Sequence, residues 1–294
     1  MELPLVVGAD GSEPSLRAVD WAAEEAALRG VPLRLVHASL WERYEGAASA
    51  EDLGKPSEEA PAYGIVDSAA RRARGRQPDL KVSTEVVPDE PEYALVREGR
   101  HASALVLGTR GRGGIAELLL GSVSLTVAAH ATCPVIVLRG RQDERAQSVT
   151  HHGRIVLGVG DVARSSAAVS FAFQEAERRG AVLEAVRAWQ CPAHETTDHP
   201  LLVGEPAHLH ERRAAEALEA ALNEVAAEHP SVKVHRRTAE GPARKVLLDA
   251  SATADLLVVG SRRQEGHFGL QLGRVAHTVL HHSACPIAVV PQRS

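Results

Sequence analysis

In the first half of the chain, short apolar runs alternate with longer stretches whose apolar residues recur at helical spacing. The runs fall at residues 3–8, 32–36, 82–87, 104–107 and 134–138. Between the first two runs, Ser12 and Gly30 are residue types that begin and end a helix. This alternation is typical of a parallel sheet with helices on both faces.

The second half of the chain repeats the plan of the first. Residues 6–33 correspond to 156–183, and residues 105–134 correspond to 257–286. Strands are predicted at 155–159, 182–189, 232–236, 255–259 and 286–290, and helices around 165–179, 207–228, 242–252 and 274–283. We therefore expect two homologous Rossmann-like α/β domains in tandem, each with an open parallel five-stranded sheet. Their expected limits are 1–140 and 154–294, with a polar linker at 141–153.

Composition narrows the classes of protein to which the chain can belong. Its 294 residues are 44% hydrophobic and 24% charged, which is typical of a globular protein. No apolar run approaches the roughly 20 residues of a membrane span. The first residues, Met1 to Pro4, lack the basic region of a signal peptide, so we expect a cytoplasmic location. The net charge of -5, without a basic run among aromatic residues, argues against a nucleic-acid partner.

Cysteine and histidine are interpreted as structural residues. Of three cysteines, Cys133 and Cys285 occupy equivalent positions before a proline, and all three are expected to be unpaired thiols. The chain has fifteen histidines, but their spacing matches no zinc-binding pattern. Neither residue type therefore predicts a metal or redox site.

The candidate chemistry lies in a glycine loop that follows the apolar run at 104–107. Gly108-Thr109-Arg110-Gly111 is followed, after nine residues, by Gly121-Ser122-Val123-Ser124 at the expected start of a helix. Free amides at a helix N-terminus attract anions, and phosphate is the obvious candidate. Neither the Walker loop nor the G-x-G-x-x-G fingerprint is present. Asp10 ends the first strand and should face the same crevice as the loop, because ligands bind at the carboxyl ends of parallel strands.

Both halves resemble the universal stress protein family, and the chain looks like a tandem member of it. ATP-binding members share the pattern G-x2-G-x9-G-S/T, which the first half satisfies at Gly108, Gly111, Gly121 and Ser122. The resemblance implies an adenine nucleotide alpha hydrolase-like fold that binds ATP, with or without Mg²⁺. It implies that Asp10 meets the ribose or the metal ion and that the main chain of Ala38 holds adenine. The implied nucleotide-binding set is Asp10, Ala38, Gly108, Gly111, Gly121, Ser122, Val123 and Ser124.

The second half departs from this pattern. Arg263, Arg274 and Ala276 stand where the first half has Gly111, Ser122 and Ser124, and Gly160, followed by Asp161, replaces Asp10. We therefore expect ATP mainly in the first domain. The alternative is that Arg263 and Arg274 grip phosphate directly, since guanidinium groups suit that task.

Three classes of function remain open. The first is a nucleotide-dependent regulatory module that responds to stress and acts on a protein partner that the sequence does not identify. The second is an enzyme, a slow ATPase or a nucleotidyl transferase, although no general base and no catalytic residue is predicted. The third is a nucleotide-free dimeric scaffold. The resemblance also implies pairing between domains or chains through the last strand of each half, 134–138 and 286–290.

Overall fold

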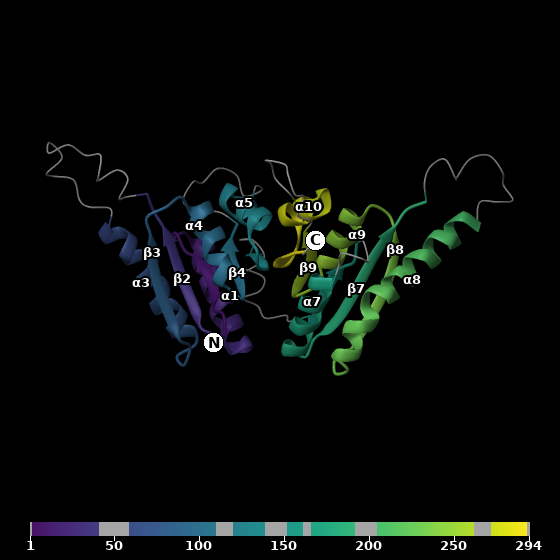
Figure 1. Ribbon diagram of the computed structural model, residues 1–294, viewed down its shortest axis with the longest axis horizontal. Coiled ribbons are helices and arrows are strands. Elements are labelled where there is room, and N and C mark those ends of the chain that lie inside the picture. Colours follow the sequence, from purple (N-terminus) through teal and green to yellow (C-terminus); the bar gives the residue numbers. More distant parts are fainter. Residues whose placement is uncertain are drawn as a thin grey trace. The chain divides into compact units, whose positions relative to one another are not determined.

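The computed structural model divides the chain into two compact units, Met1–Gln147 and Ser148–Ser294 (Figure 1). It describes residues 2–40, 59–109, 120–138, 152–160, 166–191, 205–261 and 272–292. Each unit contains five parallel strands and its own helices. Within these ranges, no helix is both long enough and apolar enough to cross a membrane.

The first unit is built on a parallel sheet with the strand order β3-β2-β1-β4-β5. The strands are β1 (Leu5–Gly8), β2 (Leu33–Ala38), β3 (Val82–Val87), β4 (Ala104–Gly108) and β5 (Val135–Leu138). Aliphatic side chains of the central strands are almost completely buried, because helices cover both faces of the sheet. The predicted five-stranded parallel sheet is confirmed for this unit.

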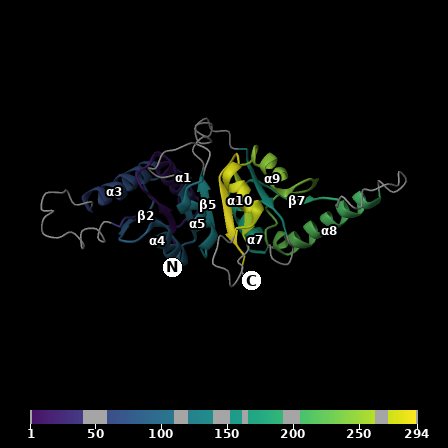
Figure 2. The same ribbon diagram turned by 90° about the horizontal axis from the view of Figure 1, so that it is seen from above.

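Two layers of helices enclose that sheet. Helices α1 (Glu13–Arg29) and α3 (Glu59–Arg76) contact each other on one face. Helices α4 (Pro91–Glu98) and α5 (Ser122–His130) contact each other on the opposite face, and the 3-10 turn η1 (Gly99–His101) follows α4. Figure 2 shows the two layers on either side of the strands. The α5 helix begins near the carboxyl end of β4, because its cap residue Gly121 bonds the carbonyl of Thr109.

The α1 helix begins and ends where the sequence predicts. Ser12 has extended backbone angles, and its side chain accepts a hydrogen bond from the Ser15 amide at 3.4 Å. Gly30 has a φ of 71°, and its amide bonds the carbonyl groups of the last turn. A serine cap and a left-handed glycine thus fix both ends of the helix that leads away from β1.

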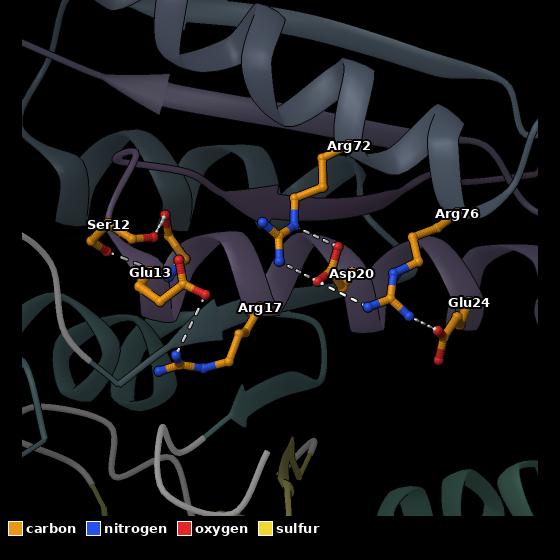
Figure 3. A network of polar contacts seen from close by, with 8 residues as sticks. Ser12, Glu13, Arg17, Asp20, Glu24, Arg72 and Arg76 are labelled. Carbon is orange, nitrogen blue, oxygen red and sulfur yellow. Dashed lines mark hydrogen bonds and ion pairs between the residues drawn. The ribbon is translucent and has the colours of Figure 1, made fainter. Parts of the chain in front are cut away.

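A cluster of ion pairs joins α1 to α3 (Figure 3). Asp20 on α1 accepts two hydrogen bonds from the guanidinium of Arg72, both at 2.7 Å, and one from Arg76 at 3.3 Å. Arg76 also contacts Glu24 at 3.0 Å. The Asp20 side chain is only 11% exposed, whereas that of Glu24 is 53% exposed. The two-pronged contact at Asp20 should therefore contribute more stability than the exposed pair at Glu24.

The second unit has the same plan. Its parallel sheet has the order β10-β9-β6-β7-β8, with β6 (Arg154–Gly158), β7 (Val182–Trp189), β8 (Val234–Glu240), β9 (Leu256–Ser261) and β10 (Ile287–Pro291). Helices α7 (Ser166–Arg179) and α8 (Glu205–Glu228) contact each other and cover one face of these strands. Helices α9 (Ala243–Ser251) and α10 (Arg274–His282) contact each other and cover the opposite face. The tandem architecture is confirmed.

One predicted strand of this unit ends four residues too early, whereas the limits of the others agree to within two residues. The sequence predicts a strand at 232–236, but β8 runs from Val234 to Glu240. It pairs with β7 as far as the register between Trp189 and Glu240. This continuation is polar because β8 is an edge strand of its unit's sheet with exposed residues, so the apolar pattern does not mark its end.

A polar cluster, called here the Glu177 cluster, ties the end of α7 to the turn between α8 and β8. The Glu177 carboxylate accepts hydrogen bonds from the Ser231 hydroxyl at 2.6 Å and from the His229 ring at 2.8 Å. These contacts, first Ser231 and then His229, hold the pKa of Glu177 below its usual value of 4.5. The cluster therefore favours the charged form of the carboxylate.

Candidate functional site

The strand order of the first unit creates a crevice at the carboxyl ends of β1 and β4. From β1 the chain adds strands on one side through β2 and on the other through β4, so the connections leave in opposite directions. A cavity of about 350 Å³ lies here, bordered by the ends of β1, β2 and β4 and by the first turns of α1, α4 and α5. Its size falls within the range of small-molecule sites.

Asp10 lies at this cavity, directly beyond β1, and its turn is held by local hydrogen bonds. One carboxylate oxygen, Oδ1, accepts the Ser12 amide at 3.0 Å and the Ser12 hydroxyl at 2.5 Å. The Asp10 amide donates to the Ser15 hydroxyl at 3.3 Å. Asp10 is thus both a turn residue and a wall of the cavity, and its carboxylate is fixed to the start of α1.

The N-terminus of α5 forms the opposite wall. Gly121 is the cap residue, and its amide donates to the Thr109 carbonyl at 2.6 Å, which fastens the helix to the end of β4. The amides of Ser122, Val123 and Ser124 belong to the first turn, where no carbonyl four residues earlier in the helix is available. All three residues border the cavity. This wall therefore carries the positive end of the helix dipole.

Two predicted residues have contacts that the sequence does not reveal. The Ser124 hydroxyl, buried with its residue at 4% exposure, donates to the Gly108 carbonyl at 2.7 Å. The donor that remains at Ser124 is its main-chain amide. A Cβ added to Gly108 would lie 2.6 Å from the carbonyl oxygen of Pro14, so this glycine lets β4 pack closely on α1. Gly111 lies outside the described residues.

The end of β2 contributes two residues to the cavity, Ala38 and His37. The His37 ring donates from Nδ1 to the Ala9 carbonyl at 2.7 Å, which sets the tautomer of a neutral ring and holds it against the turn after β1. Val36, Leu95 and Leu107 add apolar surface to the same cavity. An apolar wall, a carboxylate and a helix N-terminus thus surround one space.

Comparison with known proteins identifies the family. The model of the universal stress protein family matches residues 3–139 and again residues 151–291. The chain belongs to the universal stress protein family. It is 33% identical to universal stress protein Rv2005c of Mycobacterium tuberculosis over 98% of this chain and 97% of that one, and 33% identical to Rv1996 of the same organism over 99% and 96%. A solved universal stress protein structure from Archaeoglobus fulgidus has the same fold, with a TM-score of 0.61 over 99% of both chains at 17% identity.

The second unit of this universal stress protein has a different set of residues at the equivalent strand ends. Gly160 follows β6 where Asp10 follows β1, and the Arg187 guanidinium donates to the Gly160 carbonyl. Arg274, at the first position of α10, is exposed, and Ala276 is buried. Arg263 and Asp161 lie outside the described residues. Where the first unit has the acidic side chain of Asp10, the second unit has a glycine whose carbonyl accepts a hydrogen bond from Arg187.

The three cysteines of this universal stress protein are free thiols, and two of them are buried. Cys133 and Cys285 are buried and have no disulfide partner, and burial raises the pKa of each thiol to about 12. A thiol with such a pKa is neutral and unreactive at neutral pH. In the described part of the chain, no group of three or more histidine, cysteine or acidic side chains is arranged to hold a metal ion.

His37 is a polar residue at the cavity that the motifs did not predict, and the apolar residues Leu95 and Leu107 were not predicted either. His37 belongs to no glycine loop and to no pattern named for the family. Its signal is its position: it is the penultimate residue of β2, at the same sheet edge as Asp10 and Gly108. The rule that strand ends meet at one edge would have found it.

Proposed function

We propose that the first unit binds ATP at the carboxyl ends of β1, β2 and β4, and that the protein is a nucleotide-dependent regulatory module in a stress response. One observation carries the proposal: the first-turn residues of α5 border a cavity that Asp10 and several apolar residues also border. A phosphate chain, a ribose and a base need these three surfaces in one place.

The phosphates lie at the N-terminus of α5 in this proposal. Ser122, Val123 and Ser124 supply main-chain amides, and the exposed Ser122 also has a hydroxyl at the first helical position. The dipole of α5 adds attraction for negative charge. Gly121 brings the backbone close to the anion, and Gly111 is expected to do the same from the loop.

Asp10 holds the ribose or a metal ion. A carboxylate oxygen accepts hydrogen bonds from sugar hydroxyls, and it is the kind of hard oxygen ligand that Mg²⁺ uses together with phosphate oxygens and water. The hydrogen bonds of Oδ1 to Ser12 fix the carboxylate at the cavity wall, so the residue fits either role. When bound, Mg²⁺ would neutralise phosphate charge near this carboxylate.

The base lies against the apolar side of the cavity. Leu95 and Leu107 offer a surface for a flat ring, and the main chain at Ala38 offers an amide and a carbonyl for its edge. Adenine is therefore held by packing and by the backbone, as the family resemblance implies.

The first experiment measures the nucleotide that the purified protein retains. The protein is denatured, and released adenine nucleotide is quantified per chain, with titration of added Mg-ATP for any empty fraction. We expect about one ATP per chain, bound without multiple-turnover phosphate release. About two would support a second site in the other unit, sustained phosphate release would support the enzyme, and no binding at all would support the scaffold.

A matched pair of variants locates the site. Gly121 and Gly273 are the cap residues of α5 and α10, with similar backbone angles of φ -65°, ψ 149° and φ -60°, ψ 153° that valine can adopt. Gly121→Val should weaken ATP binding at least about tenfold, because it displaces one or two charge-assisted hydrogen bonds of about 1.5–3 kcal/mol each. Gly273→Val should leave it unchanged. Full occupancy in Gly121→Val would refute the assignment.

The assembly remains a prediction as well. We propose that the chain forms a homodimer or pairs its domains through the last strands, β5 and β10. Sedimentation velocity with and without Mg-ATP measures the oligomeric state of the chain. A monomer at all concentrations would refute the homodimer.

A further inference from the structure

The penultimate residue of β2 and its counterpart in β7 occupy the same place in the two sheets. In the first unit Gly8 pairs with Val36, and in the second unit Gly158 pairs with Val186. The next residues are His37 and Arg187. Each therefore stands beside the turn that leaves the first strand of its unit, where Asp10 or Gly160 is found.

His37 borders the cavity of the first unit. Its Nδ1 donates to the carbonyl of Ala9, the residue directly after β1, at 2.7 Å. The imidazole is a compact ring, and the contact ends one residue short of Asp10. The carboxylate of Asp10 is left beside the cavity with its own hydrogen bonds to Ser12.

Arg187 reaches one residue farther along the equivalent turn. Its guanidinium donates to the carbonyl of Gly160, the counterpart of Asp10. At this place the second unit therefore has a guanidinium group, whereas the first has a carboxylate. A Cβ added to Gly160 would meet no described atom within 4 Å, so the described part of the unit leaves room for a side chain there.

We infer that the side chain at this position decides whether a unit accepts a Mg-nucleotide: histidine leaves the crevice open, and arginine closes it. The guanidinium lies at the turn that would otherwise meet the ribose or the metal ion. It offers only hydrogen-bond donors, and it repels a divalent cation. The inference rests on the proposed ATP site of the first unit.

The test introduces arginine into the first unit. His37→Arg is compared with wild type and with Thr84→Arg, which adds the same charge on the exposed surface of β3, away from the cavity. Mg-ATP affinity is measured by calorimetry, and folding by circular dichroism and the unfolding midpoint. We expect His37→Arg to bind Mg-ATP at least tenfold more weakly and Thr84→Arg to bind it as wild type does. His37→Lys, a second long cation, replaces His37→Arg if that variant does not fold.

The reciprocal test opens the second unit. In a Gly121→Val background, Gly160→Asp combined with Arg187→His should raise the residual Mg-ATP affinity at least tenfold. Undiminished binding by a folded cationic variant at 37, or no gain from the double change, overturns the inference while leaving the first site in place. If wild type itself binds no ATP, the proposed function fails first, and the inference fails with it.

Discussion

Gly108 offers a sharp test of how the site is built, because its counterpart Gly260 provides a control in the same chain. A Cβ at Gly108 would lie 2.6 Å from the Pro14 oxygen and 2.7 Å from the Pro14 carbonyl carbon. Both atoms belong to the backbone at the start of α1. A Cβ at Gly260 would instead meet the side chain of Gln292, 2.5 Å from Nε2.

The difference in cost follows from what has to move. Ordinary contact begins at 3.4 Å, so in Gly108→Ala the first turn of α1 must retreat by about 0.8 Å (3.4 minus 2.6). Overpacking of this kind costs about 1–3 kcal/mol. In Gly260→Ala only the end of a flexible glutamine must rotate, and its Nε2 has no hydrogen-bond partner among the described residues. Replacing glycine by alanine also restricts both unfolded chains equally, by about 0.4–1 kcal/mol. We expect Gly108→Ala to be less stable than Gly260→Ala by about 1–2 kcal/mol.

Urea denaturation measures the overall stability, and hydrogen exchange on peptides from each unit assigns the loss. With an m-value of about 2 kcal/mol/M, the expected difference is a shift of roughly 0.5–1 M in midpoint. Gly108→Ala should also weaken Mg-ATP binding, because the turn that holds Asp10 is attached to α1 through Ser12. Equal midpoints for the two alanine variants would refute the packing argument.

Three further predictions concern single side chains. Because Cys133 and Cys285 are buried with pKa values of about 12, a thiol reagent at pH 8 should label one thiol per native chain and all three after unfolding; rapid labelling of three native thiols would contradict this. Asp20→Asn should lower the unfolding free energy by about 1–2 kcal/mol, and Glu24→Gln by about 0–1 kcal/mol; urea midpoints test the order. The lowered pKa of Glu177 gives a stabilisation that is present above pH 4.5 and is lost as the pH falls through the lowered pKa, so Glu177→Gln should flatten the dependence of the midpoint on acid pH.

The parts of the fold that the sequence predicts are those that burial determines. Central strands such as β4 are covered on both faces, so their residues form apolar runs that can be recognised. Ser12 and Gly30 mark the ends of α1 because a serine hydroxyl can cap a first-turn amide and glycine readily adopts a positive φ. The polar end of β8 could not be recognised, since an edge strand is held by backbone pairing that its side chains do not signal.

The candidate site was predictable in location and less so in detail. Asp10 and Gly121 border the cavity because parallel strands and the helices that follow them meet at one edge. The close packing of Gly108 on α1 needs an interatomic distance that no motif contains. The contacts of His37 and Arg187 depend on how far each side chain extends, which the sequence alone does not give.

The hydrogen bond between the Gly121 amide and the Thr109 carbonyl limits how much the length of the intervening segment matters. It joins Thr109, directly after β4, to the cap residue of α5, so this contact holds the start of α5 at the end of β4. For a closed loop, doubling the length costs only about 0.6 kcal/mol. Insertions at this point should therefore leave the start of α5 in position and change ligand affinity only through contacts of the segment itself, including the contact expected of Gly111.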